Sequence, residues 1–361
     1  MTHSYCTYSV SDVEDKLAAL GVPFSEHFAR ALVALLAGRR ISLHHVAGQM
    51  PGETDAEANR QQLRRCLDHE SLAQEAWSRA IGALLPVGKW LLALDRTEWE
   101  RGDTTINLLV LAVVIGGSAV PLLWTVMPDC GASDTAERIE LLARFVALFG
   151  RERVQYLTAD REFVGGDWIE WLLEQNVPFR IRIKANALLA NPDGSVVLPA
   201  KDWFDRRACR CKPRPMELWG LSVFVGGKRL PTKDDKGRNQ YLIIISNEPS
   251  RDLWQDYRQR WKIETLFQAL KGRGFGLESC RLSKEKRLSG WFGFLALALC
   301  WCLKVGQQLD QIKPLPLKKH GRRAVSVVRR GMQLLQELLG PLAGRPDLDK
   351  FLCVSDLLQP N

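Results

Sequence analysis

Residues 90–99 read WLLALDRTEW, a short apolar run that passes into charged and polar residues. A run of this length, rich in Leu and Trp, predicts a buried β-strand with polar residues at its end. Two longer apolar runs follow over 104–117 and 119–127, and glycines with Pro121 interrupt the stretch between Leu108 and Val126. Breakers in the middle of the stretch predict a hairpin of two buried strands rather than a membrane-spanning helix.

Helical and strand patterns alternate from residue 135 to residue 185. Apolar residues at helical spacing over 135–149 predict a helix, which Ser133 or Asp134 would cap and Gly150 would end. The next segments, 154–160, 166–176 and 179–185, predict a buried strand, a helix and a fifth strand. Three strands, a helix, a strand, a helix and a strand predict a mixed α/β sheet with helices packed against it.

The chain has 361 residues, of which 46% are hydrophobic, and is long enough for two or three domains. Apolar periodicity predicts a helical N-terminal region, in which ISLHHVAGQM and ANRQQLRRCL fit a helix-turn-helix and a plain helical bundle equally well. Pro, Gly and short strand-like pieces indicate a β-rich insertion. The division that we expect is 1–85 (helical), 86–189 (core, first part), 190–249 (insertion), 250–310 (last core helices) and 311–361 (basic, helical tail).

The chain carries a formal net charge of +9. A surplus of Lys and Arg suits a polyanionic partner such as DNA, because each phosphate contact releases counterions; a merely basic enzyme has the same composition. The polar start, MTHSYCTYSVSDVEDKL, lacks the pattern of a signal peptide. We therefore expect a cytoplasmic protein without membrane association, whose nine Cys are reduced. The pairs Cys209/Cys211 and Cys300/Cys302 lack the spacing of a zinc site.

Two carboxylates stand where apolar strands end. Asp95 follows WLLAL and Asp160 follows VQYLTA, and an Arg comes after each. Ligands gather at the carboxyl ends of strands in open sheets, so the two side chains can meet there. An Asp at this place can also be only a turn former or a helix cap. Converging carboxylates in a basic protein favour Mg²⁺ and in-line phosphoryl transfer, which two metal ions usually support with a third acid.

The segment YRQRWKIETLFQALK, residues 257–271, supplies such an acid. It predicts one helix over 254–271, in which a polar stripe about 60° wide lies beside an apolar stripe. The polar stripe holds Tyr257, Arg260, Glu264 and Lys271. A solvated surface would show the same polarity, but a carboxylate flanked by cations suits a metal ion beside phosphates.

At these residues the chain resembles the DDE transposases of the bacterial insertion-sequence-4 family, whose signature has Tyr, Arg, Glu and Lys at this spacing. The resemblance covers about 90–287 and implies an RNase H-like core with a β-rich insertion. It implies that Asp95, Asp160 and Glu264 bind two Mg²⁺ ions, for which Mn²⁺ can substitute. It also implies cut-and-paste transposition. The enzyme would cut at terminal inverted repeats, form a hairpin as related enzymes do, and join the 3′ ends to target DNA.

The resemblance further assigns residues that hold DNA near the transposon end. Tyr257, Arg260 and Lys271 match residues that grip a flipped nucleotide, and Arg182 and Lys184 match basic residues that serve the same end. Tyr241 matches a wedge aromatic, although a strand-face tyrosine in the core of the insertion is an equal alternative. Trp254 and Trp261 are expected in the core. Pairing two ends implies a synaptic homodimer, with the enzyme acting at the bacterial nucleoid. Outside the range of the resemblance, we expect the helical region 1–85 to bind DNA.

Two other functions remain open from the sequence. A metal-dependent nuclease of the same core fold, such as a resolvase, would need the carboxylates but not Tyr257, Arg260 and Lys271. A DNA-binding remnant without catalysis would need none of the three carboxylates. The remnant would bind DNA without cutting it, and the nuclease would cut without hairpin formation or strand transfer.

Overall fold

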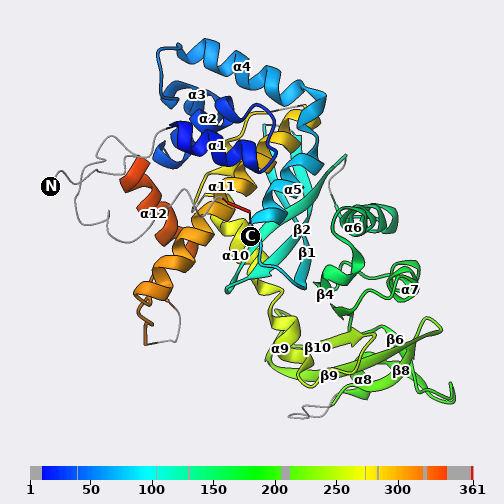
Figure 1. Cartoon of the computed structure of the whole chain (residues 1–361). Coiled ribbons are helices and arrows are strands. Elements are labelled where there is room, and N and C mark those ends of the chain that lie inside the picture. Colours follow the sequence, from blue (N-terminus) through cyan, green and yellow to red (C-terminus); the bar gives the residue numbers. More distant parts are fainter. Residues whose placement is uncertain are drawn as a thin grey trace.

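The fold is known from a computed structural model of the chain. It describes residues 10–38, 40–102, 104–128, 131–204, 212–272, 274–282, 284–319, 323–339 and 359–360. Ten strands of the described chain form one sheet, in the order β3-β2-β1-β4-β5-β10-β9-β8-β6-β7. Helices lie on both sides of the sheet, and the chain therefore has a mixed α/β fold (Figure 1).

The first five strands make the core of the sheet. They are β1 (Trp90–Arg101), β2 (Thr104–Ile115), β3 (Ser118–Met127), β4 (Val154–Ala159) and β5 (Phe179–Arg182). β1, β2 and β3 pair antiparallel, whereas β1 with β4 and β4 with β5 pair parallel. This order and these directions are the RNase H-like arrangement, so the predicted fold class is confirmed. The predicted hairpin between Leu108 and Val126 is also present, as β2 and β3.

β1 is longer than the sequence indicates, and the prediction that Asp95 ends this strand is wrong. The parallel pairing of β1 with β4 stops at Leu94, opposite Ala159. β1 then continues as a two-stranded ribbon with β2, as far as the pair Arg101 and Thr104. Asp160 directly follows β4. The two carboxylates therefore lie at the same edge of the parallel part of the sheet.

The predicted β-rich insertion extends this sheet instead of forming a separate one. It contains β6 (Leu188–Ala190), β7 (Val197–Pro199), the short helix α8 (Ala200–Trp203), β8 (Arg214–Leu218), β9 (Leu221–Lys233) and β10 (Asn239–Ser246). β10 pairs antiparallel with β5, which joins the insertion to the core strands. Cys209 and Cys211 lie outside the described residues.

α6 (Thr135–Phe149) and α7 (Gly166–Glu174) lie on one side of the core strands, and α10 (Trp261–Leu270) and α11 (Glu285–Ile312) lie on the other (Figure 1). Alternation along β1 explains the two faces. The Trp90 ring packs against the rings of Phe145 and Phe149 in α6, at centroid distances of 6.2 and 5.3 Å. Asp95 has the opposite parity and faces α10.

The N-terminal region is helical as predicted. It contains α1 (Val10–Ala19), α2 (Ser25–Gly38), α3 (Leu43–Gln49), α4 (Ala56–Asp68), the 3-10 turn Glu70–Leu72 and α5 (Gln74–Leu84). α2, α4 and α5 pack against α11, as does α12 (Val327–Leu339), while α1 packs on α2, and α3 on α2 and α4. One apolar core runs from α1 to α12. The domain boundaries and the helix-turn-helix stay predictions.

α11 is, within the described ranges, the one helix that is long and apolar enough to cross a membrane. Of its apolar stretch, 89% is buried inside the molecule. Cys300 and Cys302 lie in this helix and are fully buried, as expected for core thiols. The remaining short helical turns are Arg151–Arg153 and Leu277–Ser279, and α9 (Leu253–Arg258) precedes α10.

Candidate active site

Arg260 lies between two of the three predicted carboxylates. Its Nη1 is 3.2 Å from Oδ2 of Asp95, and its Nη2 is 2.5 Å from Oε1 of Glu264. The Arg260 residue is only 8% exposed, so its contact with the buried Asp95 is shielded from water, whereas the side chain of Glu264 is 32% exposed. A single guanidinium thus joins the carboxylate of β1 to that of α10, although the two residues are 169 positions apart in the sequence.

Asp160 contacts the other two predicted residues of this region. The hydroxyl of Tyr257 donates a hydrogen bond to Oδ1 of Asp160 at 3.1 Å, and Nη1 of Arg182 is 3.8 Å from the same oxygen. Burial raises the pKa of Tyr257 to about 12, an effect that Asp160 increases and Arg260 opposes. The phenol therefore stays protonated at neutral pH and remains a donor to the carboxylate.

Asp95 is the most buried of the three carboxylates, with a side chain that is 14% exposed. Burial raises its pKa to about 6, while the cation of Arg260 and the hydrogen bond from the Arg96 amide lower it. The desolvation of the charged form therefore outweighs the two favourable contacts. A further cation near Asp95 would favour its ionised form.

The predicted single helix over 254–271 is interrupted, and this part of the prediction is wrong. α9 ends at Arg258 and α10 begins at Trp261. Around this break the backbone turns more tightly than in an α-helix. The amide of Arg260 donates to the carbonyl of Tyr257, and the amide of Ile263 donates to the carbonyl of Arg260, both at 3.0 Å. The turn places Arg260 inward, where it reaches Asp95.

Lys271 also departs from the predicted stripe. It lies just after the last residue of α10, and its Nζ donates to the carbonyl oxygen of Glu98 in β1 at 2.6 Å. The reason is that the helix ends at Leu270, so the helical wheel no longer applies to Lys271. Lys271 holds the end of α10 against β1 instead of pointing along the line of Glu264.

The remaining predicted DNA-binding residues lie at different distances from the carboxylates. Arg182 is adjacent to Asp160, and its Nη2 donates to the carbonyl of Tyr241 at 3.1 Å, so β10 reaches the site as well. Tyr241 itself is half-buried in the sheet. Lys184 is exposed and comes two residues after the end of β5, with no contact to the carboxylates among the described interactions.

Of the two tryptophans expected in the core, Trp261 contradicts the prediction, because it is 63% exposed. It begins α10 on the side opposite Ile263 and Leu266, which are buried. Trp254 is half-buried, and the Nζ of Lys228 lies 4.9 Å from its ring centroid.

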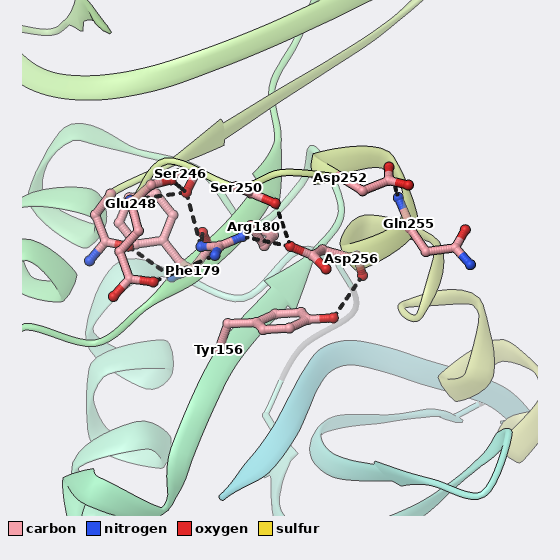
Figure 2. A network of polar contacts seen from close by, with 10 residues as sticks. Tyr156, Phe179, Arg180, Ser246, Glu248, Ser250, Asp252, Gln255 and Asp256 are labelled. Carbon is pink, nitrogen blue, oxygen red and sulfur yellow. Dashed lines mark hydrogen bonds and ion pairs between the residues drawn. The ribbon is translucent and has the colours of Figure 1, made fainter. Parts of the chain in front are cut away.

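Sequence reasoning missed one buried arginine beside the site. Arg180 is two residues before Arg182 on β5, and its side chain contacts Asp256, Ser246 and Glu248 (Figure 2). The signal was present in the segment Phe-Arg-Ile-Arg, since residues at a spacing of two point to the same face of a strand. Arg180 therefore faces the segment that carries Tyr257.

Comparison with known families decides the class of protein. The profile described as "Transposase DDE domain" matches residues 86–301, which is more than half of the chain. The chain belongs to this family. The matched range of this DDE transposase contains Asp95, Asp160 and Glu264, together with the insertion and most of α11. The helices before residue 86 and α12 lie outside it.

A search among curated proteins gives no match. Among solved structures, the chain is similar to one described as "Cryo-EM structure of piggyBac transposase synaptic complex with hairpin DNA", at 12% sequence identity and a TM-score of 0.46. The similarity covers 98% of this chain and 83% of the other.

DDE transposase domains use divalent metal ions. The chemistry of the three carboxylates fits such an ion, because Mg²⁺ and related hard cations prefer carboxylate oxygen ligands. Their arrangement places the guanidinium of Arg260 between two of them. Accordingly, no three His, Cys, Asp or Glu side chains in the described part of the chain are close enough to share one ion.

Proposed function

We propose that this DDE transposase is a cut-and-paste enzyme of the insertion-sequence-4 type. It would cut at transposon terminal inverted repeats, pass through a DNA hairpin and join the 3′ ends to target DNA. The observation that carries this proposal is the convergence of Asp95, Asp160 and Glu264 on Arg260 and Tyr257. Tyr257 and Arg260, which have the spacing of the family signature, thus contact Asp160 and Asp95 at the edge of the parallel part of the sheet.

Asp95, Asp160 and Glu264 would hold Mg²⁺, or Mn²⁺ in its place. When bound, the ions supply Lewis-acid activation of the attacking oxygen and stabilise the charge of an in-line displacement at phosphorus. The same carboxylates can serve every step, because nicking, hairpin formation and strand transfer are all displacements of this kind.

Two arginines at the site have donors left for phosphate. The Nε–H groups of Arg182 and Arg260 are buried and have no hydrogen-bond partner within the described structure. A buried donor without a partner is costly, and a phosphate oxygen of DNA would satisfy it with a charge-assisted bond. We assign these two arginines, with Tyr257 and Lys271, to the nucleotides next to the scissile phosphate.

Tyr241 and Lys184 would act on DNA from the insertion side of the site. The carbonyl oxygen of Tyr241 accepts a hydrogen bond from Arg182, whose strand, β5, pairs with β10. Tyr241 therefore lies on the strand next to Arg182. An aromatic ring in this place can stack on an unpaired base, an interaction worth about 1–3 kcal/mol per base. Lys184 is exposed and free to approach the phosphate backbone.

The charge of the chain and the reaction itself indicate its partners and its place of action. The net charge of +9 favours a polyanionic partner, and we assign DNA binding to the helices of region 1–85 as well. A synaptic complex pairs two transposon ends, so we propose that a homodimer performs the reaction. The site of action would be the nucleoid in a bacterial cytoplasm.

Glu264→Gln tests the catalytic assignment. The variant removes one charge from the carboxylate set but keeps the size of the side chain. We expect nicking of DNA that carries the terminal repeats, in the presence of Mg²⁺, to fall by more than about 10³-fold. Binding of the ends, measured by fluorescence anisotropy, should change little.

Glu174→Gln is the matched control, because Glu174 is an exposed glutamate at the end of α7, away from the site. It should nick DNA at the wild-type rate. A comparable rate for the Glu264 variant would refute the assignment of the carboxylates. Wild-type cleavage without hairpins on a denaturing gel, and without joining to target DNA, would instead indicate a plain nuclease.

A further inference from the structure

Arg180 is a buried cation whose guanidinium contacts several polar partners. It is 6% exposed. Its Nε lies 3.3 Å from Oδ2 of Asp256, and its Nη1 donates to Oγ of Ser246 at 2.9 Å. Its Nη2 is 3.5 Å from a carboxylate oxygen of Glu248. Figure 2 shows the guanidinium in the middle of this network, with partners on several sides.

These partners lie where the chain leaves the insertion and enters the catalytic helices. Ser246 is the last residue of β10, and its Oγ donates to the carbonyl of Glu248 at 2.6 Å. Asp256 belongs to α9 and also accepts a hydrogen bond from Oγ of Ser250 at 2.8 Å. Arg180 therefore connects β5, the end of β10 and the middle of α9 through one side chain.

The tyrosine of β4 completes the attachment of α9. The hydroxyl of Tyr156 donates to the carbonyl oxygen of Asp256 at 3.2 Å, and its ring lies 5.2 Å from the guanidinium carbon of Arg180. Asp256 is thus held through its backbone by β4 and through its side chain by β5. Both rotation and translation of α9 along the sheet are opposed at this residue.

The residue after Asp256 is Tyr257, which donates to Asp160, and Arg260 follows within one helical turn. A displacement of Asp256 would therefore also displace Tyr257 and Arg260, and with them the contacts to Asp160 and Asp95. A lysine could replace the charge of Arg180 but not the fork that reaches Asp256 and Ser246 together.

We propose that Arg180 is a positioning residue of the transposase active site. By holding Asp256 and the end of β10, it places Tyr257 and Arg260 against Asp160 and Asp95. It does so without touching the DNA. This inference rests on the proposed function, because it takes the carboxylates and the Tyr257–Arg260 segment as the catalytic machinery. The proposal adds Arg180 of β5 as the residue that fixes the position of the Tyr257–Arg260 segment along the sheet.

Arg180→Gln, Arg180→Lys and Asp256→Asn test the proposal with end DNA and Mg²⁺, below the lowest unfolding temperature of the set. We expect the single-turnover nicking rate of each to fall by about 10–100-fold, because a displacement of about 1 Å costs this much. The dissociation constant for the ends should change by less than about threefold. Combining Arg180→Gln with Asp256→Asn should lose little more than either variant alone, since both remove one contact.

Arg138→Gln is the matched control. Arg138 is equally buried, at 5% exposure, belongs to α6 across the core strands from α10, and bonds to Ser133 and to the carbonyl of Val164. We expect it to lower the unfolding temperature while nicking stays within about threefold of wild type.

Three outcomes would overturn the positioning role. One is an Arg180→Gln variant that nicks at the wild-type rate, and another is a rate loss that follows the unfolding temperature equally in the Arg138 and Arg180 variants. The third is a loss that lies wholly in DNA affinity, which would make Arg180 a DNA contact. Should wild type and Arg138→Gln both fail to nick, the proposed function itself falls, and the two failures are thereby distinguished. If Arg180→Gln does not fold, Arg180→Lys and Asp256→Asn still decide the question.

Discussion

At the scale of single residues, the site holds more negative than positive charge. Asp95, Asp160 and Glu264 carry three formal negative charges, and Arg260 and Arg182 provide two positive ones in contact with them. The remaining charge is consistent with a site that takes up a further cation. Arg260 contacts both Asp95 and Glu264, so it partly neutralises their charges and also separates the two carboxylates.

The raised pKa of Asp95 predicts a pH dependence of stability in the metal-free protein. Its pKa is about 6 in the folded chain, against about 3.9 for an ordinary Asp in the unfolded chain. Between these values the folded state binds more protons, so the stabilisation is complete below about pH 4 and is lost as the pH rises to about 6. The measurement is urea unfolding between pH 4 and pH 7 with a chelator present.

Asp95→Asn isolates this effect from the other titrating groups. The difference in unfolding free energy, wild type minus variant, should fall as the pH rises through this window. A difference that is constant with pH would show that Asp95 is ionised throughout. A difference that rises with pH would show that Arg260 lowers the pKa of Asp95 by more than burial raises it.

At the scale of elements, the sequence was sufficient wherever one local pattern determines the structure. The helix 135–149 is capped by Asp134, one of the two predicted caps, and ends at Gly150 with a φ of 84°. The breakers between Leu108 and Val126 do separate two strands. The predicted order of strands and helices is also the observed one, because each of these segments has a clear apolar period.

Features that depend on distant partners could not be read from local patterns. The length of β1 depends on its pairing with β2, and the break before α10 depends on the contact of Arg260 with a strand far away in sequence. Periodicity gives no sign of either. For Arg180, the spacing of two from Arg182 indicates a shared strand face, but its partners in β10 and α9 could not be predicted from this pattern. The exposed Trp261 shows that residue type alone does not predict burial.

The cap of α6 gives a prediction at this scale. The side chain of Asp134 accepts a hydrogen bond from the amide of Glu137, whose side chain accepts one from the amide of Asp134. Asp134→Ala removes one half of this capping box and should lower the unfolding free energy by about 1 kcal/mol. Asp134→Asn, which keeps a good cap, should lose clearly less. Equal losses in urea unfolding would exclude the capping contribution.

At the scale of the whole molecule, helices that are far apart in the sequence, α2 and α12, pack together on α11. α12 lies against α11 and contacts α2, where Nε2 of Gln336 donates to the carbonyl of Ala37 at 3.3 Å. The helices before the DDE domain and the helix after it therefore share one core with the domain itself. A change in α12 should therefore affect the stability of α11, which also packs on β3.

Gly331 tests this coupling, because α12 and α11 approach each other closely at this residue. A Cβ at Gly331 would lie 1.9 Å from the carbonyl oxygen of Cys302 and 2.7 Å from the amide nitrogen of Gly306, both in α11. These backbone atoms cannot move aside without displacing the helix. Gly331→Ala should therefore destabilise the protein by about 1–3 kcal/mol, although Ala is the better helix former.

Gly48→Ala provides the comparison, since Gly48 is exposed in α3 and a Cβ there would meet only Ala56, at 4.0 Å. In the absence of a clash, helix propensity should decide, and this variant should gain up to about 1 kcal/mol. Urea unfolding followed by circular dichroism gives both values under one set of conditions. Opposite signs would show that the approach of α12 to α11 contributes to the stability of the whole molecule. A stabilising Gly331→Ala would instead mean that α12 can move away from α11 at little cost, and that the C-terminal helix is not part of the cooperative core.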